Sequence, residues 1–204
     1  MKNYTMDRVV WLALFTIIYN LAEGIISLIL GLNDETLALA GFGVDSFVEV
    51  ISGLGILQMA VRIRKHPEST RSEFEKRALL ITGTAFYLLT AGLVAGAILN
   101  FVKGHKPETT VWGVVISVIS IAVMYWLYRS KVSCGRSLQA EPVLADANCT
   151  LVCIYMSVVL LVSSLIYELT GFGWIDTLGA LGLAWFSFSE GREAFEKKEE
   201  SREM

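Results

Sequence analysis

Charged residues are scarce in this sequence of 204 residues: Asp, Glu, Lys and Arg make up 18% of it, while 54% of its residues are hydrophobic. Soluble domains carry more charge, so the composition excludes that class and indicates an integral membrane protein. The net charge of −3 is small and gives no reason to expect a nucleic-acid partner. We therefore expect the lipid bilayer to surround most of the chain.

Several other patterns are missing. The three cysteines show no paired spacing in exposed links, which argues against a disulfide framework. No ten-residue segments alternate with period two, as a membrane β-barrel requires. The apolar run after Asp7 and Arg8 is far longer than the core of a signal peptide. The spans hold neither a histidine-rich cluster nor a Ser/His arrangement, so we do not expect an enzyme.

What the sequence has instead is six long apolar segments joined by short polar links. Each can cross about 30 Å of hydrocarbon, which takes about 20 helical residues. We expect an all-α, six-helix transmembrane bundle with spans at residues 9–32, 37–63, 78–102, 110–128, 143–169 and 172–189.

The placement of positive charge orients the bundle. All but two of the 17 Lys and Arg residues lie near the termini or near the second-to-third and fourth-to-fifth links; the exceptions are Lys103 and Lys106. Because cytoplasmic loops collect Lys and Arg, we expect both termini to be cytoplasmic. The chain then has a transmembrane domain at 1–195 and a short, charged, helical cytoplasmic tail at 196–204. We expect a multi-pass protein of the cell membrane, the inner or plasma membrane in a prokaryote.

The second predicted helix carries two carboxylates in its middle. Asp45 and Glu49 are four residues apart, so they face the same side of a helix. At about 1.5 Å per residue, they lie about 12 Å and 18 Å from the outer end, on either side of the midplane. Each costs on the order of 2.5–3.5 kcal/mol there, and carboxylates inside a membrane are functional by default. The pair therefore indicates a bound cation.

Two thiols lie at a similar depth on the fifth predicted helix. Cys149 and Cys153 are about 9 Å and 15 Å from the inner end, and Asp146 lies on the same face one turn earlier. Thiolates with carboxylates suit a divalent transition metal such as zinc, whereas carboxylates alone would favour magnesium, calcium or manganese. Cadmium or another soft ion also fits, and iron, cobalt and nickel are alternatives. A buried cysteine also serves as a small packing residue, so two roles stay open for Cys149.

The first predicted helix adds Asn20 and Glu23 on one face, about 17 Å and 21 Å from its inner end. Glu23 suits support of the metal ligands, proton transfer or an outer vestibule, and Asn20 suits either a ligand or a helix–helix hydrogen bond. The expected metal ligands are thus Asp45, Glu49, Cys153 and Cys149. The residues expected in entry, support or proton coupling are Glu23, Asn20 and Asp146.

These residues resemble the membrane domain of the cation diffusion facilitator family of metal/proton antiporters, over roughly residues 8–195. The most specific matches are the acid pair of the second helix and the acid that opens the fifth, in Gly43-Val44-Asp45-Ser46-Phe47-Val48-Glu49 and Ala145-Asp146-Ala147. The resemblance implies six helices with both termini inside and a metal site between helices two and five. It also implies efflux of zinc or similar divalent ions against protons by alternating access, with the metal as substrate and no cofactor.

The chain departs from the family in two places. Members usually carry His and Asp four apart on the fifth helix, where this chain has Cys149 and Cys153, which favours softer ions. The family's cytoplasmic C-terminal metal-sensing domain is missing from the sequence, so the chain looks closest to a short branch of small zinc-efflux proteins. A homodimer is expected by family analogy only. The alternative is a membrane protein that binds metal, or modulates a partner, without transporting.

Overall fold

Six α-helices form the structure, a computed structural model that describes residues 2–34, 36–65, 73–104, 106–138 and 141–203. No strand occurs in those residues, so the predicted all-α class is confirmed. In chain order the helices are α1 (Lys2–Asn33), α2 (Leu37–Lys65), α3 (Glu73–Lys103), α4 (Val111–Leu138), α5 (Glu141–Thr170) and α6 (Trp174–Glu203).

Each predicted apolar segment forms a helix, and most of the helices continue beyond it. The clearest difference is α4, which was expected to end at Tyr128 and continues to Leu138. Helix α6 likewise continues from its apolar part to Glu203, which confirms the predicted helical extension. Apolar runs mark the part of a helix that suits hydrocarbon, whereas the helix itself continues through polar residues of good helical propensity.

Within the described residues, five helices are long and apolar enough to cross a membrane, over Asp7–Asn33, Leu37–Gly55, Gly83–Lys103, Val111–Ser137 and Asp146–Thr170. The sixth predicted span lies in α6, which is not among these five. Its apolar part is short because Asp176 lies in its first turn and charged residues follow from Glu190 onward. Helix α6 packs along α3, so it belongs to the same bundle. Five such helices indicate a multi-pass membrane protein.

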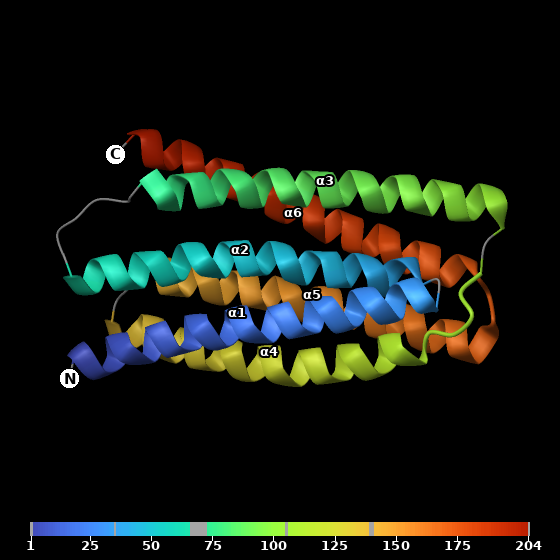
Figure 1. The fold of residues 1–204 in the computed structure, drawn as a ribbon, viewed down its shortest axis with the longest axis horizontal. Helices are drawn as coiled ribbons and strands as arrows, with labels where there is room; N and C mark the ends of the chain where they lie inside the picture. Colours follow the sequence, from blue (N-terminus) through green and yellow to red (C-terminus); the bar gives the residue numbers. More distant parts are fainter. Residues whose placement is uncertain (1, 35, 66–72, 105, 139–140, 204) are drawn as a thin grey trace.

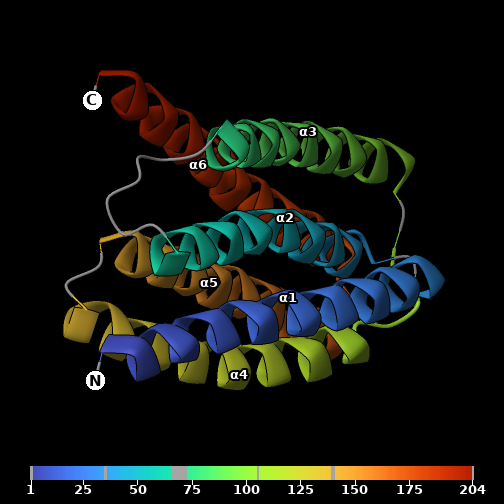
Figure 2. The same cartoon turned by 60° about the vertical axis from the view of Figure 1, so that its left-hand side comes forward.

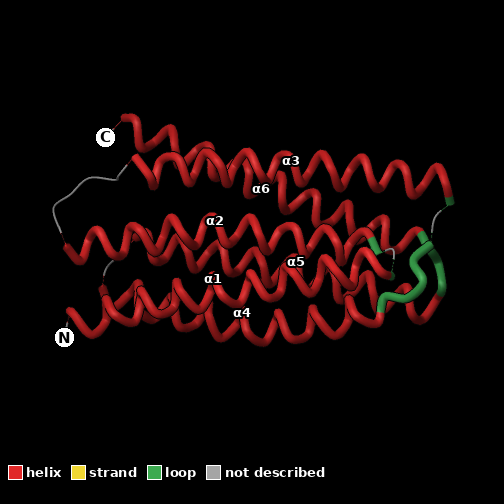
Figure 3. The backbone as a smooth tube through the Cα atoms, in the orientation of Figure 1, coloured by secondary structure: helices red, strands yellow, loops and turns green. Residues whose placement is uncertain are grey.

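The helices pack as three antiparallel pairs: α1 with α2, α4 with α5, and α3 with α6. Helices α1, α2, α4 and α5 form a four-helix group, and the α3–α6 pair lies beside α2 and α5 (Figures 1 and 2). Both chain termini lie at one end, which we call the terminus-bearing end (Figure 1). The described loops between α3 and α4 and between α5 and α6 lie at the opposite end (Figure 3).

The outer surface of the bundle is apolar, as lipid requires. Among the large apolar side chains, Leu169 is 84% exposed, Val102 76% and Trp185 72%. Contiguous apolar surface of this kind is rare on soluble monomers. The interior also contains two apolar clusters, and beside them polar side chains are buried, including carboxylates, serines and a lysine. Such buried polar groups in a membrane protein are where function is expected.

Glycines allow α1 and α2 to approach closely. A Cβ atom on Gly31 would lie 2.4 Å from the backbone nitrogen of Ala40, and one on Gly43 would lie 2.7 Å from that of Leu28. In both places the obstacle is backbone, which cannot rotate away. Small residues at such crossings let membrane helices pack backbone to backbone. This contact brings Glu23 of α1 beside the acid pair of α2.

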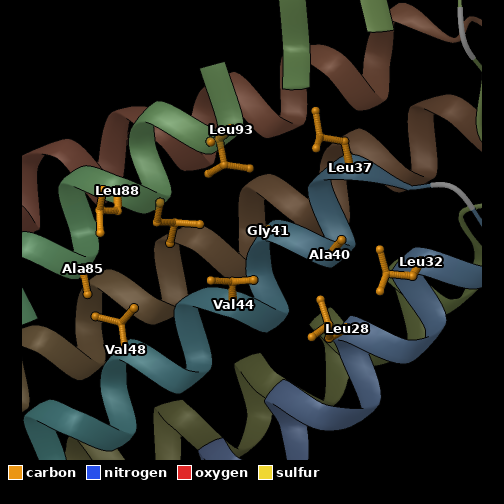
Figure 4. Close-up of a pocket in the computed structure, with 12 residues that line it drawn as sticks. Leu28, Leu32, Leu37, Ala40, Gly41, Val44, Val48, Ala85, Leu88 and Leu93 are labelled. Atoms are coloured by element: carbon orange, nitrogen blue, oxygen red, sulfur yellow. The ribbon is translucent and has the colours of Figure 1, made fainter. Parts of the chain in front are cut away.

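Helix α2 presents two different faces. One face carries Asp45, Ser46 and Glu49 toward neighbouring helices. Another contributes Val44 and Val48 to a groove of about 530 Å³ between α1, α2 and α3, whose walls are apolar side chains (Figure 4). The acids and the groove therefore occupy separate faces of one helix, so the carboxylates lie away from the apolar walls of the groove.

Candidate metal site

The centre of the candidate site is a contact between α2 and α5. The thiol of Cys153 faces Oε1 of Glu49 directly, although the two residues are far apart in sequence. Cys153 is 6% exposed and also donates to the backbone oxygen of Cys149 at 3.0 Å. The structure thus brings together two of the residues that the sequence predicted as ligands, one from each expected helix.

Asp45 lies one helical turn from Glu49 and is 2% exposed. Among the described residues, its Oδ1 atom has no hydrogen-bond partner. Glu23, Glu49 and Glu190 all lie close enough for their charges to act on Asp45. A buried carboxylate oxygen without a partner is costly, and the neighbouring acids add repulsion. The group therefore lacks the counter-charge that a cation would supply.

Glu23 of α1 lies beside this pair and is 6% exposed. The hydroxyl of Tyr19 donates to its Oε1 at 2.8 Å, and the hydroxyl of Ser46 donates to its Oε2 at 3.2 Å. Ser46 is the neighbour of Asp45 in sequence, so this hydrogen bond connects α1 to the acid face of α2. Asn20 is fully buried, and no partner of its side-chain amide lies among the described residues.

Two serines join α4 to the Cys153 side of the site. The hydroxyls of Ser157 and Ser120 lie 3.0 Å apart, and the Ser157 hydroxyl lies 2.8 Å from the backbone oxygen of Cys153. Both serines are fully buried. Hydroxyls both donate and accept, so they can adapt to a change in the protonation of their neighbours. The site is therefore lined from α1, α2, α4 and α5.

Asp146 lies closer to the start of α5, toward the terminus-bearing end, and it has a cationic partner. Its Oδ2 atom lies 2.8 Å from Nζ of Lys131, and the exposed fractions of the two side chains are 11% and 2%. Lys131 also donates to the hydroxyl of Thr150 at 2.9 Å. The structure places Asp146 in an ion pair, about two turns from Cys153 along the same helix.

The sequence-predicted residues thus fall into three groups. Glu49 and Cys153 are in contact; Asp45, Glu23 and Asn20 are buried on adjoining helix faces; and Asp146 is engaged by Lys131. Cys149 is partly buried one turn from Cys153. Across the described ranges, no three or more His, Cys, Asp or Glu side chains stand in an arrangement that could hold a metal ion. Two of the four side chains expected as ligands are thus in contact, and each of the other two lies one helical turn from one of them.

Sequence reasoning missed the role of Lys131, which it assigned to the polar cytoplasmic side. A signal was present: Met124, Leu127, Lys131 and Cys134 follow helical spacing, and each is no more than 2% exposed. The lysine therefore occupies a position on the buried stripe of α4. The bridging serines were also missed, because serine is common in membrane helices and carries no distinctive spacing.

The donor set suits a soft or borderline divalent metal. Carboxylate oxygen and thiolate sulfur are both zinc ligands, and deprotonated thiols favour zinc and its softer neighbours over magnesium or calcium. A divalent cation at this place would also neutralise carboxylates that lack a counter-charge. The donor types therefore match those that such a metal takes, while no three of these side chains converge among the described residues.

Comparison with known protein families gives an independent finding. Residues 10–198 match the cation efflux transmembrane domain, and this match covers nearly the whole bundle. No curated protein sequence matches the chain. A domain match of this extent agrees with the apolar helices and with the buried acids of α2. The chain belongs to the cation efflux family, a family of cation transporters.

Proposed function

We propose that this protein exports divalent transition-metal ions, zinc or a similar soft ion, in exchange for protons. The single observation that carries the proposal is the contact of Glu49 with Cys153, beside the buried and unpartnered oxygen of Asp45. The chain also belongs to the cation efflux family, whose members transport cations, and this supports a role of the site in transport.

The metal is bound by Asp45, Glu49 and Cys153, with Cys149 or a water molecule as the fourth ligand. Asp45 and Glu49 share one face of α2, and Glu49 contacts Cys153 of α5. Rotation about side-chain bonds then converges these groups on one ion. Ligands must be deprotonated to bind, so protons and metal compete for the same atoms. Proton entry thereby releases the metal, and Glu23 accepts a proton or the leaving ion.

Access alternates between the two ends of the bundle. Both termini lie at one end, and the Lys and Arg bias makes that end cytoplasmic. Rocking of the helix pairs against each other opens the site first to the terminus-bearing end and then to the opposite one. Neither step requires a large change within a helix.

The test is metal uptake into proteoliposomes, with Zn²⁺ or Cd²⁺ as substrate and an imposed pH gradient. We expect Asp45→Ala and Glu49→Ala to lose uptake, since each removes a ligand and a proton-accepting group. Glu196→Gln is the matched control, because Glu196 is an acid whose side chain is 56% exposed and lies far along α6. Wild-type rates in both alanine variants would refute the site. Counterflow of preloaded metal distinguishes a transporter from a protein that only binds metal.

A further inference from the structure

Lys131 holds a buried ammonium group between two side chains of α5. Its Nζ atom lies 2.8 Å from Asp146 Oδ2 and 2.9 Å from Thr150 Oγ1, and the lysine side chain is 2% exposed. A buried charge is costly unless it is paired and hydrogen-bonded, and here it is both. This contact therefore fixes the position of α4 against the first turns of α5.

The ion pair lies between the proposed metal site and the terminus-bearing end. Asp146, Thr150 and Cys153 follow the spacing i, i+4 and i+7, so they share one face of α5. Asp146 is nearest the start of the helix, so a cation that moves along this face from the terminus-bearing end meets Asp146 before Cys153. The charge of Lys131 also acts on Glu49. The first acid on that path already holds a cation of the chain itself.

We propose that Lys131 is a tethered cation that occupies Asp146 and closes the terminus-bearing end of the path to the metal site. The inference rests on the proposed function for its meaning in transport, but the closure itself can be measured without transport. An arriving ion must displace the ammonium from Asp146. A divalent ion carries twice the charge of the ammonium, whereas a monovalent ion gains nothing by the exchange, so Lys131 also favours entry of divalent ions.

The three native cysteines provide the test. Cys153 lies beyond the proposed closure, and Cys134 is a 2% exposed thiol of α4 that packs in the core near Lys131. The full-length protein in detergent is labelled with N-ethylmaleimide, a neutral reagent, and peptide mapping gives a separate rate for each cysteine. The variants are Lys131→Met, which removes the charge, and Lys131→Arg, which keeps a cation opposite Asp146.

We expect Lys131→Met to accelerate labelling of Cys153 by about tenfold or more, which corresponds to about 1.4 kcal/mol of lost closure. Removing a neighbouring positive charge disfavours the reactive thiolate, so faster labelling reports access rather than reactivity. Lys131→Arg should restore the slow rate, and Cys134 should stay slow throughout. An unchanged Cys153 rate in Lys131→Met overturns the proposal. An equal acceleration at Cys134 overturns it too, because that result indicates general loosening of α4.

A second variant covers the case in which Lys131→Met does not fold with Asp146 left unpaired. Lys131→Met with Asp146→Asn removes both charges and keeps similar volumes, and it should label Cys153 as fast as the single variant; slow labelling overturns the closure. Protection of Cys153 by Zn²⁺ is measured alongside. If Zn²⁺ protects Cys153 in no variant, the metal site is refuted, while the labelling rates still decide whether Lys131 closes the path.

Discussion

Two groups of buried or partly buried acids lie in this bundle, and they differ in what balances their charge. Asp146 is paired with the ammonium of Lys131 at 2.8 Å. Glu49 is in contact with a thiol, and no ion pair of Asp45 or Glu49 occurs among the described residues. The difference indicates the kind of cation that each group meets. Asp146 has a cation attached to the chain, whereas under the proposed function Asp45 and Glu49 would meet a cation that arrives and leaves.

The largest expected effect comes from breaking the fixed pair. Asp146→Asn leaves the Lys131 ammonium buried and uncompensated, which should lower the free energy of unfolding by about 3 kcal/mol. Asp45→Asn should not lower it, because the substitution removes a charge that has no counter-charge in the metal-free protein. Thermal unfolding of the metal-free protein in detergent measures both variants.

An exposed ion pair serves as the control for this experiment. Arg192 and Glu196 lie 2.7 Å apart with side chains 71% and 56% exposed, and Glu196→Gln should leave the thermal midpoint unchanged. Equal midpoints for Asp146→Asn and Asp45→Asn would remove the distinction between the two groups of acids.

The second prediction concerns the two thiols. Cys153→Ser should weaken Cd²⁺ binding by more than the roughly 10–100-fold that outer partners of a metal site contribute, because a soft ligand in contact with Glu49 is lost. Cys149→Ser should have a smaller effect, because the thiol that faces Glu49 is that of Cys153. Calorimetric titration with Cd²⁺ and Zn²⁺ measures both. A larger loss for Cys149→Ser would move the centre of the site by one turn of α5.

The third and smallest effect concerns an acid whose partners are backbone groups. Asp176 of α6 accepts hydrogen bonds from the backbone nitrogens of Leu37 at 2.9 Å and Ala38 at 3.2 Å, so it caps α2. Asp176→Ala should therefore lower stability by about 1 kcal/mol, the usual loss for a helix cap. Metal affinity should stay unchanged, because the cap is at the end of α2 remote from Glu49. A thermal midpoint equal to that of the unsubstituted protein would contradict the role of this cap.

Most of the fold could be predicted from the sequence, because local patterns determine it. An apolar run of about 20 residues specifies a membrane helix without reference to its neighbours. The ends of α4 and α6 were less predictable, since their polar residues continue the helix beyond the apolar run. The sequence also predicts a sixth span in α6, yet α6 is not among the five helices that are long and apolar enough to cross a membrane. Asp176 and the charges from Glu190 onward leave it only a short apolar part.

The site was predictable only in part, for a related reason. Spacing within one helix placed Asp45 with Glu49, and Cys149 with Cys153, on common faces. The partner of Asp146 could not be obtained this way, because Lys131 belongs to another helix and the rule for positive charges assigns it to the cytoplasm. Contacts between helices depend on how the faces are rotated against each other, and spacing within each helix does not specify that rotation.

The glycine contacts between α1 and α2 have a consequence for motion. At Gly31 and Gly43 the backbones of the two helices approach without a side chain between them, so we expect α1 and α2 to move together. If access alternates as proposed, we expect the change at the other contacts of α2, where side chains separate it from α5 and α3. The contact of Glu49 with Cys153 lies at one of these boundaries, so the proposed metal site would lie between the parts that move.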